Sequence, residues 1–157
     1  MLSITNENIL ISVDVDSSGE IIRLLTDLLV RNGCVKSEYA DVVITREEQY
    51  PTGIPTAGLS VAIPHGFADD CVLKPSIGVA TLARPIAFKN MFDPDEELVV
   101  GMVFLIALAS KDKNDLAKDL GKVMDILSDA DLLSRLYAAK SGHEFAEIMD
   151  SRLEEDP

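Results

Sequence analysis

The spacing of hydrophobic residues divides the chain into a helical beginning, a middle rich in short strands and a helical end. Between residues 21 and 29 the apolar side chains recur every three or four positions, which predicts an amphipathic helix. Ser17-Ser18 precedes this helix with hydroxyl groups that can cap it, and Asn32-Gly33 follows it as a stop signal. A second helix is predicted from about Glu38 to Glu48, with Ser37 as its cap.

The middle of the chain contains apolar runs that are too short for helices and are bounded by proline, glycine and acidic residues. These runs, and one near the N-terminus, predict strands over Ile9–Val15, Leu59–Ile63, Ile77–Leu82, Ile86–Phe88 and Leu98–Leu108. The last of them is the most continuously apolar, so we expect it to lie centrally with both faces covered. Pro51–Pro55 predicts a constrained turn, and residues 92–97 predict an acidic loop.

The last third of the chain contains three further helical segments. Apolar stripes predict helices around residues 116–127 and 132–137, and Ser141-Gly142 opens a third that runs from His143 to about Leu153. Helices at both ends with strands between them predict an α/β fold of three layers, with helices on both faces of one sheet. No linker or repeat divides the chain, so we expect a single domain over residues 1–157.

The composition is strongly acidic, which narrows the classes of partner. The 27 Asp and Glu residues outnumber the 14 Lys and Arg residues, and the formal net charge is −13. Nucleic acid and anionic lipid are bound through positive surfaces, so neither is expected as a partner. A protein with a basic patch is a better candidate because an acidic field attracts it, although solubility alone also explains the charge.

Neither the cysteines nor the apolar segments indicate an exported or membrane protein. Cys34 and Cys71 lie far apart and form no CxxC pair, so we expect two free thiols in a reducing compartment. The longest apolar run, Leu98–Ala109, is shorter than the roughly 20 residues that a membrane-spanning helix needs. The N-terminus has no basic segment and no long apolar block, so we expect a soluble, cytoplasmic protein without membrane insertion.

His65 is the strongest candidate for chemistry. It follows an apolar strand and Pro64 and precedes Gly66, which predicts a loop at the carboxyl end of a strand, where ligands gather in open α/β sheets. A neutral imidazole nitrogen is nucleophilic and suits phosphoryl relay. A structural histidine that closes the turn through backbone hydrogen bonds explains the same residues. The second histidine, His143, lies at a polar helix start and is expected on the surface.

Arg46, Thr52 and Gly53 precede His65 in the chain and carry groups that can hold a phosphate. Arg46 lies at the end of the second predicted helix, and its guanidinium can pair with phosphate oxygens or with the neighbouring Glu47. Thr52 and Gly53 can offer a hydroxyl and backbone N–H groups to an anion, or simply form a tight turn. The sequence contains no GxxxxGK[ST] loop, zinc-ligand spacing or GxSxG elbow, so we expect no metal and centre any chemistry on His65.

The residues around Arg46 and His65 form two motifs in a fixed order. The first is Arg46-Glu47 followed by Pro51-Thr52-Gly53-Ile54, and the second is Ala62-Ile63-Pro64-His65-Gly66. Together they resemble the IIA component of the fructose-mannitol class of the bacterial sugar phosphotransferase system. The resemblance spans nearly the whole chain, and Pro51–Ile54 with Phe88–Met91 is most similar to galactitol-type IIA proteins.

This resemblance implies a mixed sheet with helices on both faces, and a phosphotransferase component that works through a phosphohistidine intermediate without a cofactor. It implies that His65 accepts phosphate from the carrier HPr and passes it to a cysteine of a IIB component. The purpose is uptake of a sugar or sugar alcohol that IIA does not bind directly. Arg46 is then expected to stabilise the phosphate, and Thr52, Gly53 and Gly66 to shape the pocket.

One departure from the family concerns a second histidine, which mannitol-type members carry at the head of the helix after the long buried strand. Residues 109–116 contain no histidine here, and Asn114 is the nearest polar candidate to hold the His65 ring or the phosphate. Two alternatives to a transport component stay open. One is a regulatory IIA-like module that reports phosphotransferase flux by binding another protein, and the other is a hydrolase or binding domain with a structural His65.

Overall fold

The computed structural model describes residues 4–108 and 113–154, and within these ranges the side chains of residues 69, 113–116, 119, 153 and 154 are not described. The strands are β1 (Ile9–Val13), β2 (Gly53–Ile54), β3 (Ser60–Ala62), β4 (Ser76–Asn90) and β5 (Asp93–Ala107). The α-helices are α1 (Ser18–Arg31), α2 (Tyr39–Gln49), α3 (Lys113–Leu127), α4 (Ala130–Ala138) and α5 (Gly142–Glu154). Two short 3-10 helices are η1 (Asn6–Asn8) and η2 (Asp69–Cys71).

The two long strands β4 and β5 form the centre of a mixed sheet. They pair antiparallel over most of their length. β1 lies parallel to β4, and β3 lies parallel to β5. The short strand β2 pairs antiparallel with β3 and reaches the end of β4 through Gly53 and Asn90. Within the described residues this makes a five-stranded sheet, and the expected mixed sheet is confirmed.

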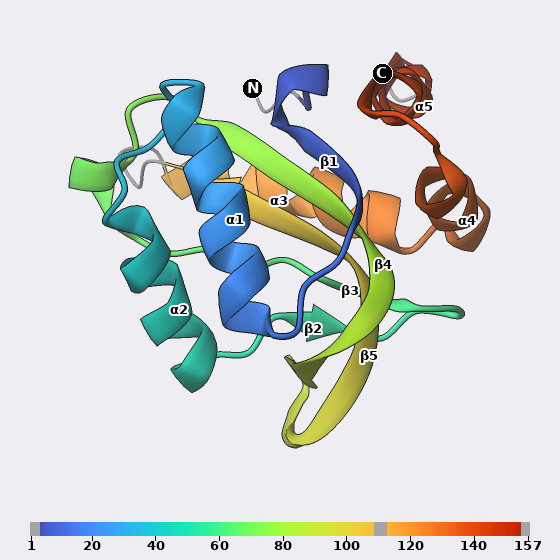
Figure 1. Ribbon diagram of the computed structural model, residues 1–157, viewed down its shortest axis with the longest axis horizontal. Helices are drawn as coiled ribbons and strands as arrows, with labels where there is room; N and C mark the ends of the chain where they lie inside the picture. Colours follow the sequence, from blue (N-terminus) through green and yellow to red (C-terminus); the bar gives the residue numbers. More distant parts are fainter. Residues whose placement is uncertain (1–3, 109–112, 155–157) are drawn as a thin grey trace.

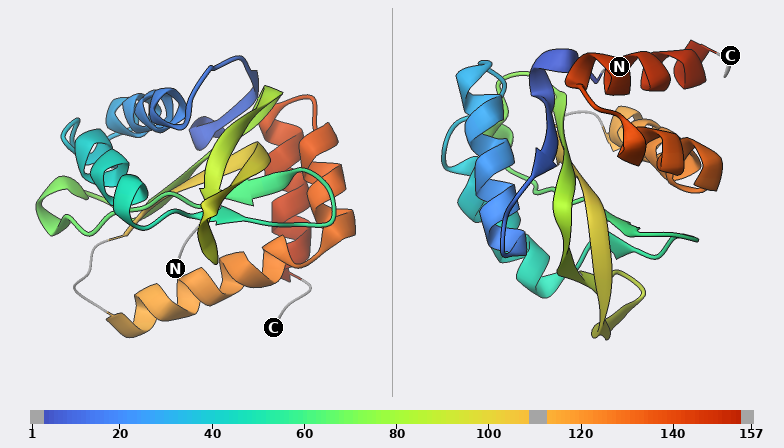
Figure 2. Two further views of the ribbon diagram at one scale, coloured as in Figure 1. Left: turned by 90° about the horizontal axis from the view of Figure 1, so that it is seen from below. Right: turned by 45° about the vertical axis from the view of Figure 1, so that its right-hand side comes forward.

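Helices cover both faces of this sheet, as the sequence predicts. Figure 1 shows α1 and α2 in front of the sheet and α3 behind it. In the right-hand view of Figure 2 the sheet is seen nearly edge-on, with α1 on one side and α4 and α5 on the other. The three-layer α/β architecture is therefore confirmed, and its two interfaces need a strand that is apolar on both faces.

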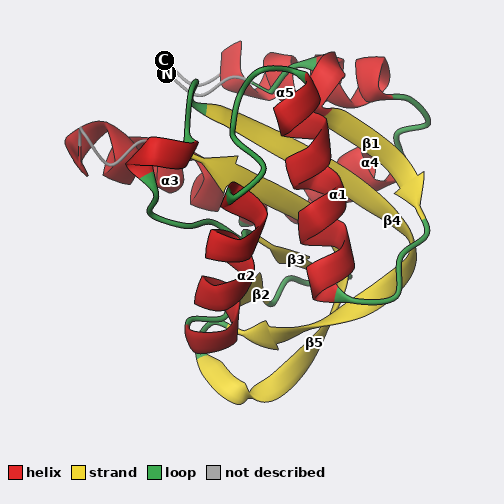
Figure 3. Ribbon diagram, turned by 60° about the vertical axis from the view of Figure 1, so that its left-hand side comes forward, coloured by secondary structure: helices red, strands yellow, loops and turns green. Residues whose placement is uncertain are grey.

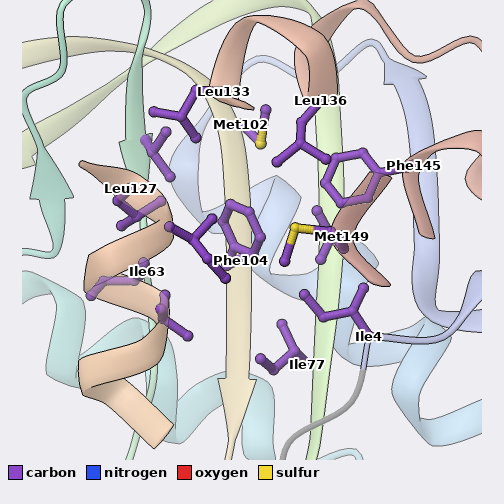
Figure 4. Packing of buried hydrophobic residues seen from close by; sticks show 14 of the residues in the cluster. Ile4, Ile63, Ile77, Met102, Phe104, Leu127, Leu133, Leu136, Phe145 and Met149 are labelled. Atoms are coloured by element: carbon purple, nitrogen blue, oxygen red, sulfur yellow. The ribbon is translucent and has the colours of Figure 1, made fainter. Parts of the chain in front are cut away.

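β5 supplies that doubly buried strand. Met102, Phe104 and Ile106 face the cluster formed with α3, α4 and α5, in which Phe104 lies near Phe145 of α5 (Figure 4). The residues between them, Val103, Leu105 and Ala107, are buried in the opposite cluster against α1 and α2. Adjacent side chains of a strand point to opposite faces, so one continuous apolar run serves both cores. The predicted central strand over Leu98–Leu108 is confirmed.

The capping residues predicted for α1 are confirmed, and the one predicted for α2 is not. The Ser17 hydroxyl accepts a hydrogen bond of 3.2 Å from the Glu20 N–H and so caps α1. Gly33 follows the helix with φ at 73°, a conformation that glycine adopts without strain. The prediction that Ser37 caps α2 is wrong, because a turn precedes the helix and Glu38 takes the cap position without a side-chain bond.

Two predictions for the middle of the chain are also wrong. Residues 86–88 are not a separate edge strand but part of β4, which continues through Pro85. The β4–β5 pairing is interrupted between Thr81 and Ile86, so the missing N–H of Pro85 removes no ladder bond. The predicted acidic loop is instead the start of β5 from Asp93, because it pairs across the hairpin with the end of β4.

Candidate functional site

His65 lies where two parallel strands end side by side. β3 ends at Ala62, and the Pro64 carbonyl accepts a 3.0 Å hydrogen bond from the Ile106 N–H near the end of β5. His65 itself forms an isolated parallel bridge with Ile106. β3 and β5 run in the same direction, so their carboxyl ends share one edge of the sheet, the expected place for a ligand. The histidine is thereby presented from a rigid part of the fold.

The imidazole of His65 is held in one tautomer. Its Nδ1 lies 2.8 Å from the Ile63 carbonyl oxygen. A carbonyl only accepts hydrogen bonds, so Nδ1 carries the proton and Nε2 keeps a free lone pair. Burial lowers the pKa of His65 below its usual value; the bond to Ile63 opposes this and the charge of Arg46 adds to it. The ring is therefore neutral and nucleophilic near neutral pH.

Arg46 presents its guanidinium between two aromatic rings beside His65. Its Cζ lies 4.9 Å from the centroid of the Tyr50 ring and 4.5 Å from that of Phe67. The Phe67 ring in turn meets the His65 ring edge-on, with centroids 5.8 Å apart. The Nε of Arg46 is buried and has no hydrogen-bond partner among the described residues. The two rings thus hold a cation next to the imidazole with donor capacity to spare for an anion.

A pocket of about 310 Å³ brings these groups together. Figure 3 shows α2 on the same side of the sheet as α1, with its C-terminal end leading into the turn before β2. The lining of the pocket comes from the end of α2, the following turn, the His65 loop and the β4–β5 hairpin: Arg46, Gln49, Tyr50, Pro51, Thr52, His65, Met91 and Pro94. Within this described lining Arg46 is the only side chain with a full positive charge, so an anion entering the pocket would meet it beside His65.

Thr52 lines the pocket, but its hydroxyl is already engaged. It donates to the carboxylate of Glu47, 2.7 Å from Oε1 and 2.9 Å from Oε2, and the Thr52 N–H lies 3.1 Å from Oε1. Burial is the main cause that raises the pKa of Glu47 to about 7, against the Thr52 hydrogen bonds and the charge of Arg46. The sequence suggested only an ion pair for Glu47, and this bracing of the turn was missed.

The two glycines of the motifs allow close approaches rather than line the described pocket. A Cβ on Gly53 would lie 2.5 Å from the Lys89 carbonyl oxygen, so only glycine lets β2 approach β4 this closely. A Cβ on Gly66 would lie 2.9 Å from Cγ1 of Val42 on α2. Both glycines therefore allow neighbouring elements to lie closer together than a side chain would permit.

Tyr39 is a supporting residue that sequence reasoning did not single out. Its hydroxyl donates to the Ile106 carbonyl at 2.6 Å and accepts from the Gly66 N–H at 3.2 Å. Burial raises the pKa of Tyr39 well above its usual value. The first turn of α2 is thereby fixed to the loop that follows His65. A tyrosine on the inward face of a predicted helix was the only available signal, because its partners are distant in sequence.

Asn114 and His143 are the remaining predicted residues, and neither is seen in this cluster. Asn114 falls in the first turn of α3, and its side chain is outside the described part of the structure. His143 is exposed on α5, where its Nε2 lies 2.9 Å from Oε1 of Glu147. The expectation of a surface histidine is confirmed.

The described residues offer no cluster for metal chemistry. Across residues 4–108 and 113–154 no group of three or more His, Cys, Asp or Glu side chains is arranged to hold a metal ion. In the same ranges, no helix combines the length and the apolar character needed to cross a membrane. Cys34 is buried and Cys71 half-buried, and both thiols are free, as expected.

The fold and this site correspond to a known class of protein. The sequence model of the family described as "Phosphoenolpyruvate-dependent sugar phosphotransferase system, EIIA 2" matches residues 3–152. The chain therefore belongs to this family of phosphotransfer components, and the resemblance inferred from its two motifs is confirmed at that level.

Curated relatives are similar over most of the chain. The mannitol-specific EIICBA component of Escherichia coli (strain K12) is 28% identical over 148 residues, which cover 93% of this chain and 22% of the relative. The ascorbate-specific EIIA component of the same strain is 25% identical over 148 residues, which cover 92% of this chain and 90% of the relative. The chain thus spans about a fifth of the mannitol relatives' length and nearly all of the ascorbate one.

Solved structures share the fold. The complex of enzyme IIAMTL and phosphorylated enzyme IIBMTL from Escherichia coli matches with a TM-score of 0.77 and 25% identity, covering 97% of this chain and all of that one. The nitrogen regulatory protein IIA-Ntr from Neisseria meningitidis matches with a TM-score of 0.78 and 20% identity, covering 93% of this chain and 95% of that one. The second likeness shows the fold alone. The type of IIA fold expected from the sequence is confirmed.

Proposed function

We propose that the chain is a cytoplasmic phosphoryl carrier that accepts phosphate from phospho-HPr on Nε2 of His65 and passes it to a cysteine of a IIB component. The observation that carries the proposal is the 2.8 Å bond between Nδ1 of His65 and the Ile63 carbonyl. It leaves Nε2 unprotonated, and burial favours the neutral ring. A nucleophilic nitrogen is thus available without a general base.

The phosphoryl group moves in two steps, first from the donor to His65 and then from His65 to IIB. Nε2 attacks the phosphorus atom, the N–P bond forms, and the bond between phosphorus and the donor breaks. The ring gains positive charge while Nδ1 keeps its proton, and the Ile63 carbonyl stabilises that charge. In the second step a IIB thiolate attacks phosphorus, the S–P bond forms, the N–P bond breaks, and its electron pair returns to Nε2.

Arg46 is the group we assign to the charge of the phosphoryl oxygens. Phosphoryl transfer depends on positioning and charge neutralisation, and the guanidinium can donate two bonds in one plane. Tyr50 and Phe67 hold that plane beside His65. Replacing Arg46 by lysine removes the planar fork and keeps the charge, so we expect slower phosphorylation of a folded protein. Thr52, Gly53 and Gly66 are assigned to the shape of the pocket, and Asn114 stays the candidate from the sequence to hold the His65 ring or the phosphate.

The surface around the pocket suits a partner protein. Tyr50 and Phe67, which flank Arg46, are 60% and 51% exposed, and Phe92, the neighbour of Met91 in the chain, is 69% exposed. We assign this apolar surface to HPr and IIB in turn, because both must bring a reactive group to His65. The net charge of −13 favours partners with basic surfaces and fast, transient encounters.

Phosphorylation in a defined mixture tests the proposal. With phosphoenolpyruvate, enzyme I and HPr, we expect the chain to gain one acid-labile phosphate. His65→Ala should abolish the gain, while His143→Ala, the matched control at the exposed histidine, should leave it unchanged. Undiminished phosphorylation of His65→Ala would overturn the proposal.

Transfer to IIB separates transport from regulation and tests the sugar. Failure of the phosphorylated chain to pass phosphate to any IIB cysteine would favour the regulatory alternative. Within transport we propose galactitol, on the likeness of Pro51–Ile54 and Phe88–Met91 to galactitol-type proteins. The named relatives are mannitol and ascorbate components, so the three IIB types should be compared directly. Faster transfer to a mannitol or ascorbate IIB would reject galactitol.

A further inference from the structure

Glu47 is a half-buried acid near the end of α2 that takes no part in the two transfer steps. Its side chain is half-buried, whereas its neighbour Glu48 is exposed. Both carboxylate oxygens accept from the Thr52 hydroxyl, and Oε1 also accepts from the Thr52 N–H. Burying a carboxyl group is costly unless it is hydrogen-bonded, so these contacts are a specific feature of the turn.

A continuous path of hydrogen bonds connects this carboxylate to the reacting histidine. The Thr52 carbonyl accepts from the Ile63 N–H at 3.2 Å. The Ile63 carbonyl, on the same residue, accepts from Nδ1 of His65 at 2.8 Å. At each step the donor lies on the His65 side of the path and the acceptor on the Glu47 side. Glu47 therefore fixes Thr52, Thr52 fixes Ile63, and Ile63 fixes the ring.

No shorter connection serves the same purpose among the described residues. The partner of Nδ1 is a backbone carbonyl, not a carboxylate that could hold the ring directly. The orientation of the Ile63 carbonyl depends on where the turn between α2 and β2 places Thr52. Glu47 is the group that braces this turn from α2, and Arg46, one residue earlier, points to the pocket instead.

We propose that Glu47 is a positioning residue for phosphoryl transfer, acting through Thr52 and Ile63 to keep the His65 ring with Nδ1 protonated and Nε2 free. This inference rests on the proposed function, because it assigns a role within the same site. It also explains why the two motifs occur together. The Arg-Glu pair supplies one residue for the phosphate and one for the geometry of the histidine that receives it.

Three variants test the proposal. Glu47→Ala should slow phosphorylation by phospho-HPr roughly tenfold to a hundredfold, the order that a misplacement of about 1 Å costs. Glu47→Gln retains an acceptor oxygen for Thr52 and should keep most of the rate. Glu48→Ala is the matched control at the exposed neighbour and should leave the rate unchanged.

The second readout is the tautomer of His65, which the nitrogen resonances of its ring report in the unphosphorylated protein. The wild type, Glu47→Gln and Glu48→Ala should show a proton on Nδ1, and Glu47→Ala should show a mixture of the two neutral tautomers. A merely structural role would lower the unfolding temperature without changing the tautomer. If Glu47→Ala is poorly folded, Thr52→Val removes the two hydroxyl bonds to Glu47 and keeps the side-chain shape and the N–H bond to Oε1, so a smaller population of the second tautomer is expected. A His65 ring that stays wholly Nδ1-protonated in folded Thr52→Val would count against the proposal.

The outcomes separate the inference from the function on which it rests. If the wild type accepts no phosphate, the proposed function fails, and the tautomer measurement still decides whether Glu47 orients the ring. If the wild type is phosphorylated and folded Glu47→Ala matches it in both rate and tautomer, the inference is wrong and the function stands.

Discussion

Replacing Glu47 by glutamine should change how the stability of the protein depends on pH. Burial raises the pKa of Glu47 from 4.5 to about 7, so the folded state binds a proton that the unfolded chain releases. The resulting stabilisation is complete below pH 4.5 and is lost as the pH rises through about 7. Glutamine does not titrate, so it cannot contribute this pH-dependent stabilisation.

The pKa sets the size of the effect. At about 1.4 kcal/mol per pH unit, the interval from 4.5 to about 7 corresponds to at most about 3.5 kcal/mol in the free energy of unfolding. A cavity of about 320 Å³ beside Glu47, which Lys89 and Glu97 also line, admits solvent and reduces that value. We therefore expect the wild type to lose about 1–3 kcal/mol relative to Glu47→Gln between about pH 5 and about pH 8.

Urea unfolding of both proteins at several pH values in this range measures the difference. Other groups titrate in both proteins and cancel, and Glu48→Gln controls for the loss of a surface charge. A difference between wild type and Glu47→Gln that stays constant within about 0.5 kcal/mol across the range would contradict the reasoning. It would mean that Glu47 is ionised in the folded protein at no cost.

Two further variants test the supports of the site. Tyr39→Phe leaves the buried Gly66 N–H and Ile106 carbonyl without this partner, so the free energy of unfolding should fall by about 1–3 kcal/mol in urea titrations. Gly53→Ala places a Cβ 2.5 Å from the Lys89 carbonyl oxygen, so β2 must move and the midpoint of thermal unfolding should fall.

Matched controls exist for both variants. Tyr50→Phe removes a hydroxyl from a 60% exposed tyrosine and should leave the stability unchanged. Gly58→Ala adds a Cβ with no atom within 4 Å and should be tolerated. A loss for Tyr39→Phe or Gly53→Ala no larger than that of its control would contradict the role given to the residue.

The arrangement of layers could be predicted because it depends on local patterns. The apolar run that becomes β5 lacks a polar face, so it had to lie between two cores, and Val103 and Phe104 indeed enter opposite clusters. Ser17 and Gly33 limit α1 through bonds and backbone angles within a few residues. The two motifs around Arg46 and His65 likewise identified the part of the chain that forms the pocket.

The features that were missed depend on partners distant in sequence. Residues 93–97 look like a loop because they are acidic and contain proline, yet pairing such as that of Glu97 with Lys89 makes them a strand. Tyr39 reaches Ile106 across the fold, which no local pattern reports. From the sequence, Glu47 is only one possible ion-pair partner of Arg46, since nothing there shows that the turn folds back onto its carboxylate.

The central claim is that Nε2 of His65 carries the phosphate. The chain has only two histidines, so a protein labelled with ¹⁵N-histidine gives ring signals from His65 and His143 alone. After phosphorylation by phosphoenolpyruvate, enzyme I and HPr, we predict coupling between phosphorus and Nε2 of His65, with the His143 signals unchanged. Coupling to His143 or to Nδ1 of His65, or no coupling at all, would contradict the account.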